Sequence, residues 1–235
     1  MTQLFSSLPI PPYSLLRIIA IVFSLIFVIL KRKSFGITLP DTLKMAAFAV
    51  FGAIAGAKVL YCIGQIVLHA SEPAFWSLRN WNTLIRAGGV LYGSLLGIIG
   101  MIFLFAKLFN YKAIDLLGLA SIALFGANFF SRLGCLLAGC CYGIQFSNGK
   151  QFPYQLSEGI LCALVFFCFV LWKPEQNRRS QIFPISMMLY GIIRFALEFF
   201  RGDESRGIWL LSTSQWISVI FISVSILWLL KARKT

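Results

Sequence analysis

Residues 113–143 read AIDLLGLASIALFGANFFSRLGCLLAGCCYG, and this stretch decides the fold class. Its first part, about 113–134, is an apolar run long enough to cross a lipid bilayer as a helix. It ends in Arg132-Leu-Gly-Cys-Leu-Leu-Ala-Gly-Cys-Cys-Tyr-Gly143, which holds an arginine, three cysteines and three glycines. A charge at membrane depth is costly unless it is paired or faces a wet cavity, so Arg132 indicates a functional site. The glycines beside it allow a sharp turn or the close approach of a ligand.

The composition of the whole chain is that of an integral membrane protein. Hydrophobic residues make up 59% of the 235 residues and charged residues 12%, against about 45–50% and about 25% in soluble domains. No polar tract is long enough for a soluble domain, so residues 1–235 are predicted to form a single transmembrane domain. We predict an all-α, polytopic membrane protein with about seven transmembrane helices, near 13–30, 42–66, 87–108, 113–134, 153–172, 182–200 and 211–230.

The net charge of +13 is distributed as in a membrane protein rather than a nucleic-acid-binding protein. Twelve basic residues fall on one predicted side of the membrane and five on the other. The positive-inside rule places the richer side in the cytoplasm, which puts the N-terminus outside and the C-terminus inside. The basic balance therefore predicts contact with anionic lipid and no nucleic-acid partner.

A polar stripe marks the late segment Tyr190-Gly-Ile-Ile-Arg-Phe-Ala-Leu-Glu-Phe-Phe-Arg201. Helical spacing puts Tyr190, Arg194 and Glu198 on one face, with Arg201 three residues further on. A structural Arg194–Glu198 pair is one interpretation of this stripe. The other is an anion site in which Arg194 and Arg132 face one cavity, because the planar guanidinium suits a phosphate. In a bilayer the abundant phosphate belongs to a phospholipid.

Two other groups of residues each have a structural and a functional interpretation. Lys58 lies in a small-residue helix face and is a partner for Glu158 or Glu198, or a ligand-binding residue. Glycines also concentrate at the start of the predicted third span, at Gly88, Gly89 and Gly93, beside Tyr92. Such a cluster is typical of close helix packing, or of a thinned helix that admits a lipid headgroup near the Tyr92 hydroxyl.

The six cysteines form two sets. Three lie inside apolar runs and are predicted to be small packing residues: Cys62, Cys162 and Cys168. Cys135, Cys140 and Cys141 cluster at the outer end of the fourth span, where free thiols, a disulfide and soft-metal ligands are all compatible with the pattern. A nearby Arg132 would make a thiol more reactive. The C-x4-C-C spacing does not match a zinc pattern, and the only histidine, His69, lies in a predicted loop, so we predict no metal site and no cofactor.

Four segments together resemble the prolipoprotein diacylglyceryl transferase family of bacterial inner-membrane enzymes. Gly88-Gly89…Gly93-x3-Gly97 resembles the family's glycine-rich third span, and Ser131–Gly143 resembles its signature GRxGNFxNGExxG. Phe152-Pro-Tyr-Gln-Leu-Ser-Glu158 is similar to HPxQLYE, and Tyr190–Arg201 to YGxxRxxxEFFR. The order and approximate spacing of the blocks agree over nearly the whole chain.

The resemblance implies transfer of a diacylglyceryl group from phosphatidylglycerol to a thiol of a prolipoprotein or related peptide, in the bacterial cytoplasmic membrane. It implies that Arg132 and Arg194 hold the phosphate and that Tyr190 and Tyr13 line the lipid site. It also implies that the support positions of the site are Glu158, Glu198, Arg201, Pro153 and Gln155.

The chain departs from the family's pattern at its acid–base positions. Tyr92 stands where the family has a histidine, Cys135 where it has the signature asparagine, and Cys140 where it has the signature glutamate. Phe152 replaces the histidine of HPxQLYE, and the short stretch between Gly143 and Pro153 predicts a reduced periplasmic head region. The arginines expected to bind the lipid phosphate are thus retained, and the positions expected to act on the acceptor thiol are altered.

These departures leave three functions open. The chain is a lipid-to-thiol transferase with Arg132, Arg194, Tyr92, Cys140 and Cys141 in its catalytic site. Alternatively, it is an enzyme of the same fold that uses its own Cys140 or Cys141 for thiol or redox chemistry, or a non-catalytic phospholipid-binding protein.

Overall fold

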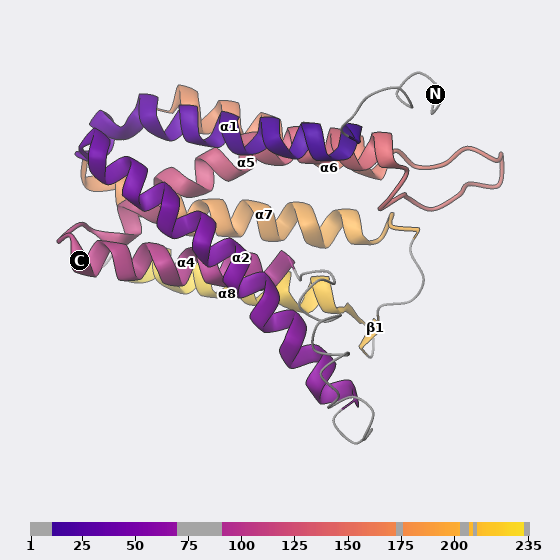
Figure 1. Ribbon diagram of the computed structural model, residues 1–235. Coiled ribbons are helices and arrows are strands. Elements are labelled where there is room, and N and C mark those ends of the chain that lie inside the picture. The colour runs from indigo at the N-terminus through magenta and orange to yellow at the C-terminus, as the bar shows by residue number, and fades with distance from the viewer. Residues whose placement is uncertain (1–10, 70–90, 173–175, 203–206, 209–210, 233–235) are drawn as a thin grey trace. The chain divides into compact units, whose positions relative to one another are not determined.

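The computed structural model describes residues 11–69, 91–172, 176–202, 207–208 and 211–232 (Figure 1). Within these residues the chain is almost entirely helical. Its α-helices are α1 (Pro12–Lys31), α2 (Leu39–His69), α4 (Leu91–Leu108), α5 (Ala113–Ala138), α6 (Tyr154–Leu171), α7 (Ile182–Glu198) and α8 (Thr213–Ala232). The short elements are two 3-10 helices, η2 (Arg32–Phe35) and η4 (Gln176–Gln181), and an antiparallel pair of two-residue strands, β1 (Gly207–Ile208) and β2 (Leu211–Ser212).

The predicted class of a multi-pass helical membrane protein is confirmed. Six of the described helices are long and apolar enough to cross a membrane, and α4 is a seventh, shorter apolar helix. Large apolar side chains lie on the helix surfaces, for example Leu171 at 78% and Leu227 at 68% exposure, as expected where lipid is the solvent. The sidedness of the termini stays a prediction. One boundary was wrong, because α2 continues to His69, which the sequence placed in a loop.

The chain forms two compact units, and the prediction of a single domain over 1–235 stays a prediction. The first unit consists of residues 1–31 and 118–235, and the second of residues 32–117. In the first unit, α7 packs along α8 (Figure 1). A cluster of phenylalanines joins α1, α5 and α6, with the Phe23 and Phe166 rings 5.5 Å apart. Gly126 of α5 makes room for them, since a Cβ atom there would overlap the Phe23 ring.

The second unit is organised by glycines where α2 packs against α4. A Cβ atom at Gly97 would overlap the carbonyl oxygen of Gly52, and one at Gly93 would overlap that of Gly56. Small residues let two helix backbones approach this closely, which is the main source of helix association inside a membrane. The structure therefore supports the packing interpretation for Gly93. Gly88 and Gly89 lie outside the described residues.

Candidate active site

Five charged side chains of the first unit form one alternating chain of ion pairs. Arg132 Nη2 lies 2.6 Å from Glu158 Oε1, and Arg194 Nη1 lies 3.4 Å from Glu158 Oε2. Arg194 Nη2 lies 3.0 Å from Glu198 Oε2, and Arg201 Nη1 lies 3.7 Å from the same oxygen. Arg132 and Arg194 thus converge on one carboxylate. The helical pair Arg194–Glu198 is also present, so the two interpretations of the polar stripe describe one network.

The positions of these side chains follow from three helices. Arg132 lies near the end of α5, Glu158 lies in the second turn of α6, and Arg194 and Glu198 lie one turn apart on α7. Gly159 follows Glu158, and a Cβ atom there would lie 3.3 Å from Arg132 Cβ, so this glycine lets α5 approach α6. Glu158, which the sequence left as a possible partner of Lys58, pairs with two arginines.

The network is buried and rich in arginine. The side chain of Glu158 has no exposed surface, and those of Arg194 and Glu198 are 8% and 7% exposed. Three guanidinium groups thus meet in a site almost closed to solvent, where electrostatic interactions are stronger than in water. Planar guanidinium groups gathered in this way suit an anion such as a phosphate.

Tyr154 lies at the centre of the network and was not singled out by sequence reasoning. Its side chain is fully buried, and its ring centroid lies 6.0 Å from the guanidinium carbon of Arg132 and 5.8 Å from those of Arg194 and Arg201. The Tyr154 hydroxyl also accepts a hydrogen bond from Arg194. One signal was available in the sequence, since Tyr154 is four residues from Glu158 and shares its helix face.

Two serines near the start of α8 complete the polar shell and were also missed. Arg194 Nη2 donates to Ser214 Oγ at 3.2 Å, and Ser212 Oγ donates to Glu198 Oε1 at 3.1 Å. Both bonds orient charged groups that already belong to the network. The site is therefore built from α5, α6, α7 and the start of α8.

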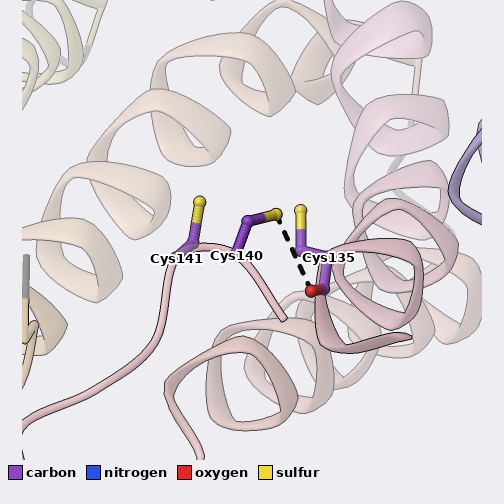
Figure 2. A group of neighbouring side chains, drawn as sticks. All are labelled: Cys135, Cys140 and Cys141. Atoms are coloured by element: carbon purple, nitrogen blue, oxygen red, sulfur yellow. Dashed lines mark hydrogen bonds between the residues drawn. The ribbon is translucent and has the colours of Figure 1, made fainter. Parts of the chain in front are cut away.

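The three clustered cysteines are brought together by the turn that ends α5 (Figure 2). Gly139 N donates to Leu136 O at 3.2 Å, Cys140 N donates to Cys135 O at 3.2 Å, and Gly139 has φ +67°. These are the two hydrogen bonds and the left-handed residue of a Schellman motif, which brings the residue after the glycine back over the last helical turn. The sulfur atoms of Cys135, Cys140 and Cys141 all lie within 4.8 Å of one another.

Cys141 has a backbone conformation that is unusual for a residue other than glycine. Its φ is 57°, in the left-handed region, where a Cβ atom costs roughly 1–2 kcal/mol. A hydrogen bond with Cys135 and the positive charges of Arg132 and Arg201 lower the pKa of the Cys141 thiol to about 5, against the opposing effect of burial.

The loop that carries these thiols is held in place from two sides. Gln155 Nε2 donates to Cys140 O at 2.8 Å. Gly202 N donates to Tyr142 O and Ile144 N donates to Phe200 O, each at 3.0 Å, so the loop pairs with the chain that follows α7. Gly202 permits this pairing because a Cβ atom there would overlap the Gly143 carbonyl oxygen, and Gly143 in turn makes room for the backbone of Phe152. The cysteines are therefore attached to the same elements as the arginines.

The remaining predicted residues lie in different places. The Tyr13 side chain lies beside Gly134, with Tyr13 Cδ2 3.5 Å from a Cβ built there, so it belongs to the neighbourhood of the cysteine turn. Tyr190 packs edge-on against Phe125, with ring centroids 6.2 Å apart. Tyr92 lies on α4 in the second unit, whereas the site described above is built from the first.

Comparison with known proteins identifies relatives over most of the chain. The family model described as prolipoprotein diacylglyceryl transferase matches residues 1–231. The phosphatidylglycerol–prolipoprotein diacylglyceryl transferase of Clostridium tetani is 31% identical over 212 residues, which is 83% of this chain and 82% of that protein. A protein of the same name from Clostridium perfringens, numbered 2, is 30% identical over 76% of this chain and 73% of its own length. One from Helicobacter pylori is 26% identical over 80% and 76%.

Proposed function

The chain belongs to the prolipoprotein diacylglyceryl transferase family, and we propose from this membership that it moves a diacylglyceryl group from phosphatidylglycerol to a prolipoprotein. The acceptor atom in this proposal is a cysteine thiol of the prolipoprotein. The site of the reaction is the cytoplasmic membrane of a bacterium, in which the protein spans the bilayer several times.

The convergence of three arginines in one buried site is the observation that carries the proposal. Arg132, Arg194 and Arg201 meet around two carboxylates in a site that is almost closed to solvent. A phosphodiester carries a negative charge on oxygen atoms that accept hydrogen bonds. A guanidinium group has five N–H donors in a planar fork, which matches the oxygens of a phosphate.

The reaction forms a carbon–sulfur bond and breaks a carbon–oxygen bond. The acceptor sulfur attacks the carbon of the diacylglyceryl group that is bonded to the phosphate. The bond between this carbon and the phosphate oxygen breaks, and its electron pair goes to that oxygen. Glycerol phosphate leaves with this added negative charge, and the thiol proton goes to solvent. Fixed positive groups stabilise such a leaving group because they need no reorganisation as charge develops. We assign this role to Arg132, Arg194 and Arg201, with Glu158 and Glu198 as the residues that position them.

A transfer assay in membranes tests the proposal. Phosphatidylglycerol labelled in its acyl chains is mixed with a peptide that carries a lipoprotein cysteine, and label on the peptide is measured. The native chain is expected to transfer label. Arg132→Lys keeps the positive charge but loses the planar set of guanidinium N–H donors. The rate of label transfer is expected to fall by about 10²–10³-fold, the usual effect of losing one donor to a developing negative charge. Lys44→Gln changes a half-exposed pair in the second unit and serves as the control with unchanged rate.

The acidic Cys141 supports a second candidate function, in which the chain's own thiol is the nucleophile. Its lowered pKa is expected of a reactive cysteine, and its left-handed backbone is a strain of the kind that clusters at active sites. In this case label would accumulate on the chain itself. It would not exceed one diacylglyceryl group per molecule, because the thioether formed on Cys141 is stable and the thiol is not regenerated. Loss of that label in Cys141→Ser, with none on the peptide, would replace the first proposal by the second.

A further inference from the structure

We propose that Cys135, Cys140 and Cys141 bind one zinc ion, whose fourth position takes the acceptor thiol. The metal site follows from the cysteine geometry, and its role in catalysis rests on the transferase function proposed above. Zinc would then supply the thiol activation for which the family's pattern has a histidine and this chain has Tyr92.

The geometry of the three thiols is close to that of a zinc site. Zn–S bonds of about 2.3 Å in a tetrahedron place neighbouring sulfur atoms about 3.8 Å apart. The three sulfur atoms already lie within 4.8 Å of one another, so rotamer changes of about 1 Å would complete the site. Figure 2 shows the Cys140 side chain directed toward Cys135, to whose carbonyl oxygen its thiol donates at 3.7 Å. Binding of a metal ion would also explain why Cys141 is held with φ 57°.

The number of ligands points to a catalytic rather than a structural zinc. The group contains three ligand residues, and no fourth histidine, cysteine, aspartate or glutamate joins it among the residues that the structure describes. Structural zinc sites have four protein ligands, whereas catalytic sites have three and leave one position for water or substrate. A three-cysteine site is thus suited to accept one more thiolate.

Net charge favours zinc over copper. Thiolates select soft ions such as Cu(I) and Zn(II). Three thiolates with Zn²⁺ carry one negative charge, whereas the same thiolates with Cu⁺ would carry two, and the smaller net charge costs less to remove from water. The cysteine loop is joined to the arginine site by the hydrogen bond from Gln155 to Cys140 and by the pairing of Gly143 with Arg201.

The zinc-dependent step balances without a redox partner. The acceptor thiol replaces the zinc-bound water and loses its proton to solvent, because a coordinating thiol is deprotonated. The bound sulfur then attacks the diacylglyceryl carbon, the carbon–oxygen bond breaks, and its electron pair leaves on glycerol phosphate. The product sulfur is a neutral thioether, which has lost the charge that held it to the metal. It exchanges for water, and zinc remains Zn(II) throughout.

Metal content tests the site independently of activity. The purified full-length protein is dialysed against a chelator, reloaded with Zn²⁺ or Co²⁺, and its bound metal is measured. About one Zn²⁺ per chain is expected, with sulfur-to-cobalt charge-transfer absorption for Co²⁺. Cys135→Ser, Cys140→Ser and Cys141→Ser should each weaken zinc binding by about tenfold or more. Cys168→Ser is the matched control, since Cys168 is exposed on α6 and lies outside the cluster.

A second readout uses the native sequence and so does not depend on the folding of variants. Zinc should protect Cys135, Cys140 and Cys141 from alkylation, as read by peptide mass spectrometry, and leave the labelling of Cys168 unchanged. Unprotected thiols, or a stoichiometric Cu(I) site that Zn²⁺ does not displace, would overturn the proposal.

The transfer assay separates the metal site from its catalytic role. Loss of transfer on chelation, and its return with Zn²⁺, is the expected result. Full transfer by the metal-free protein would overturn the catalytic role and leave the proposed transferase intact. Zinc binding without any transfer by the loaded protein would overturn the transferase proposal and leave the metal site.

Discussion

Replacing Glu158 by glutamine should destabilise the protein more than any other single change in the charged network. Glu158 is fully buried and accepts from Arg132 at 2.6 Å and from Arg194 at 3.4 Å. Glutamine keeps the shape and removes the charge, which leaves three guanidinium groups with one carboxylate. Removing one partner of a buried ion pair costs about 3–5 kcal/mol. For a chain of this length each kcal/mol lowers Tm by about 2–4 °C, so Tm should fall by about 6–20 °C.

Thermal unfolding in detergent, followed by tryptophan fluorescence, measures this effect. Adding Arg132→Gln to Glu158→Gln restores the native net charge of the network, so the double variant should be more stable than Glu158→Gln alone. Lys44→Gln is the control with little change in Tm, because Lys44 is half exposed where it pairs with Asp41. If the double variant loses the sum of the two single effects, the two groups do not act as a pair and the charge argument is wrong.

Three further predictions test other parts of the structure. Gly97→Ala should destabilise the α2–α4 contact because its methyl group meets the Gly52 carbonyl, whereas Gly100→Ala, with nothing within 4 Å, should be neutral or stabilising by up to about 1 kcal/mol in the same unfolding assay. Tyr154→Phe removes the hydroxyl that accepts from a buried guanidinium and should cost about 1–3 kcal/mol. In metal-free protein, iodoacetamide should alkylate Cys141 with a rate that rises to a plateau above a midpoint near pH 5; a midpoint near 9 would contradict the lowered pKa. Because this pKa is depressed from 9.0 to about 5 in the folded state, the thiolate should stabilise the fold fully above pH 9 and lose that effect progressively as pH falls to 5.

The membrane-spanning helices were predictable because their signal is local. A run of apolar residues of bilayer length is helical whatever surrounds it, since unpaired backbone groups are too costly in lipid. The predicted spans 113–134, 153–172 and 182–200 accordingly differ from α5, α6 and α7 by four residues or fewer at each end. Surface lipid contact was harder to predict. Cys168 lies in an apolar run and was interpreted as a packing residue, but it is exposed.

The charged site was only half predictable because its contacts join different helices. The pair Arg194–Glu198 follows from helical spacing, and so does the shared face of Tyr154 and Glu158. The choice of Arg132 and Arg194 as partners of Glu158 depends on how α5, α6 and α7 pack, which no spacing rule gives.

The cysteine cluster shows a local signal that spacing patterns for metal sites do not include. In a Schellman turn the residue after the left-handed glycine returns to the residue five positions before it. A cysteine at each of these positions gives C-x3-G-C, which is the sequence from Cys135 to Cys140 in this chain. The turn alone therefore predicts that these two thiols are neighbours, before any tertiary contact forms. Cys141 follows directly, and its left-handed backbone turns the chain again at the thiol pair. Replacing Gly139 by alanine should strain this turn at φ +67° and weaken metal binding without removing any ligand, whereas Gly64→Ala, in open space on α2, should not.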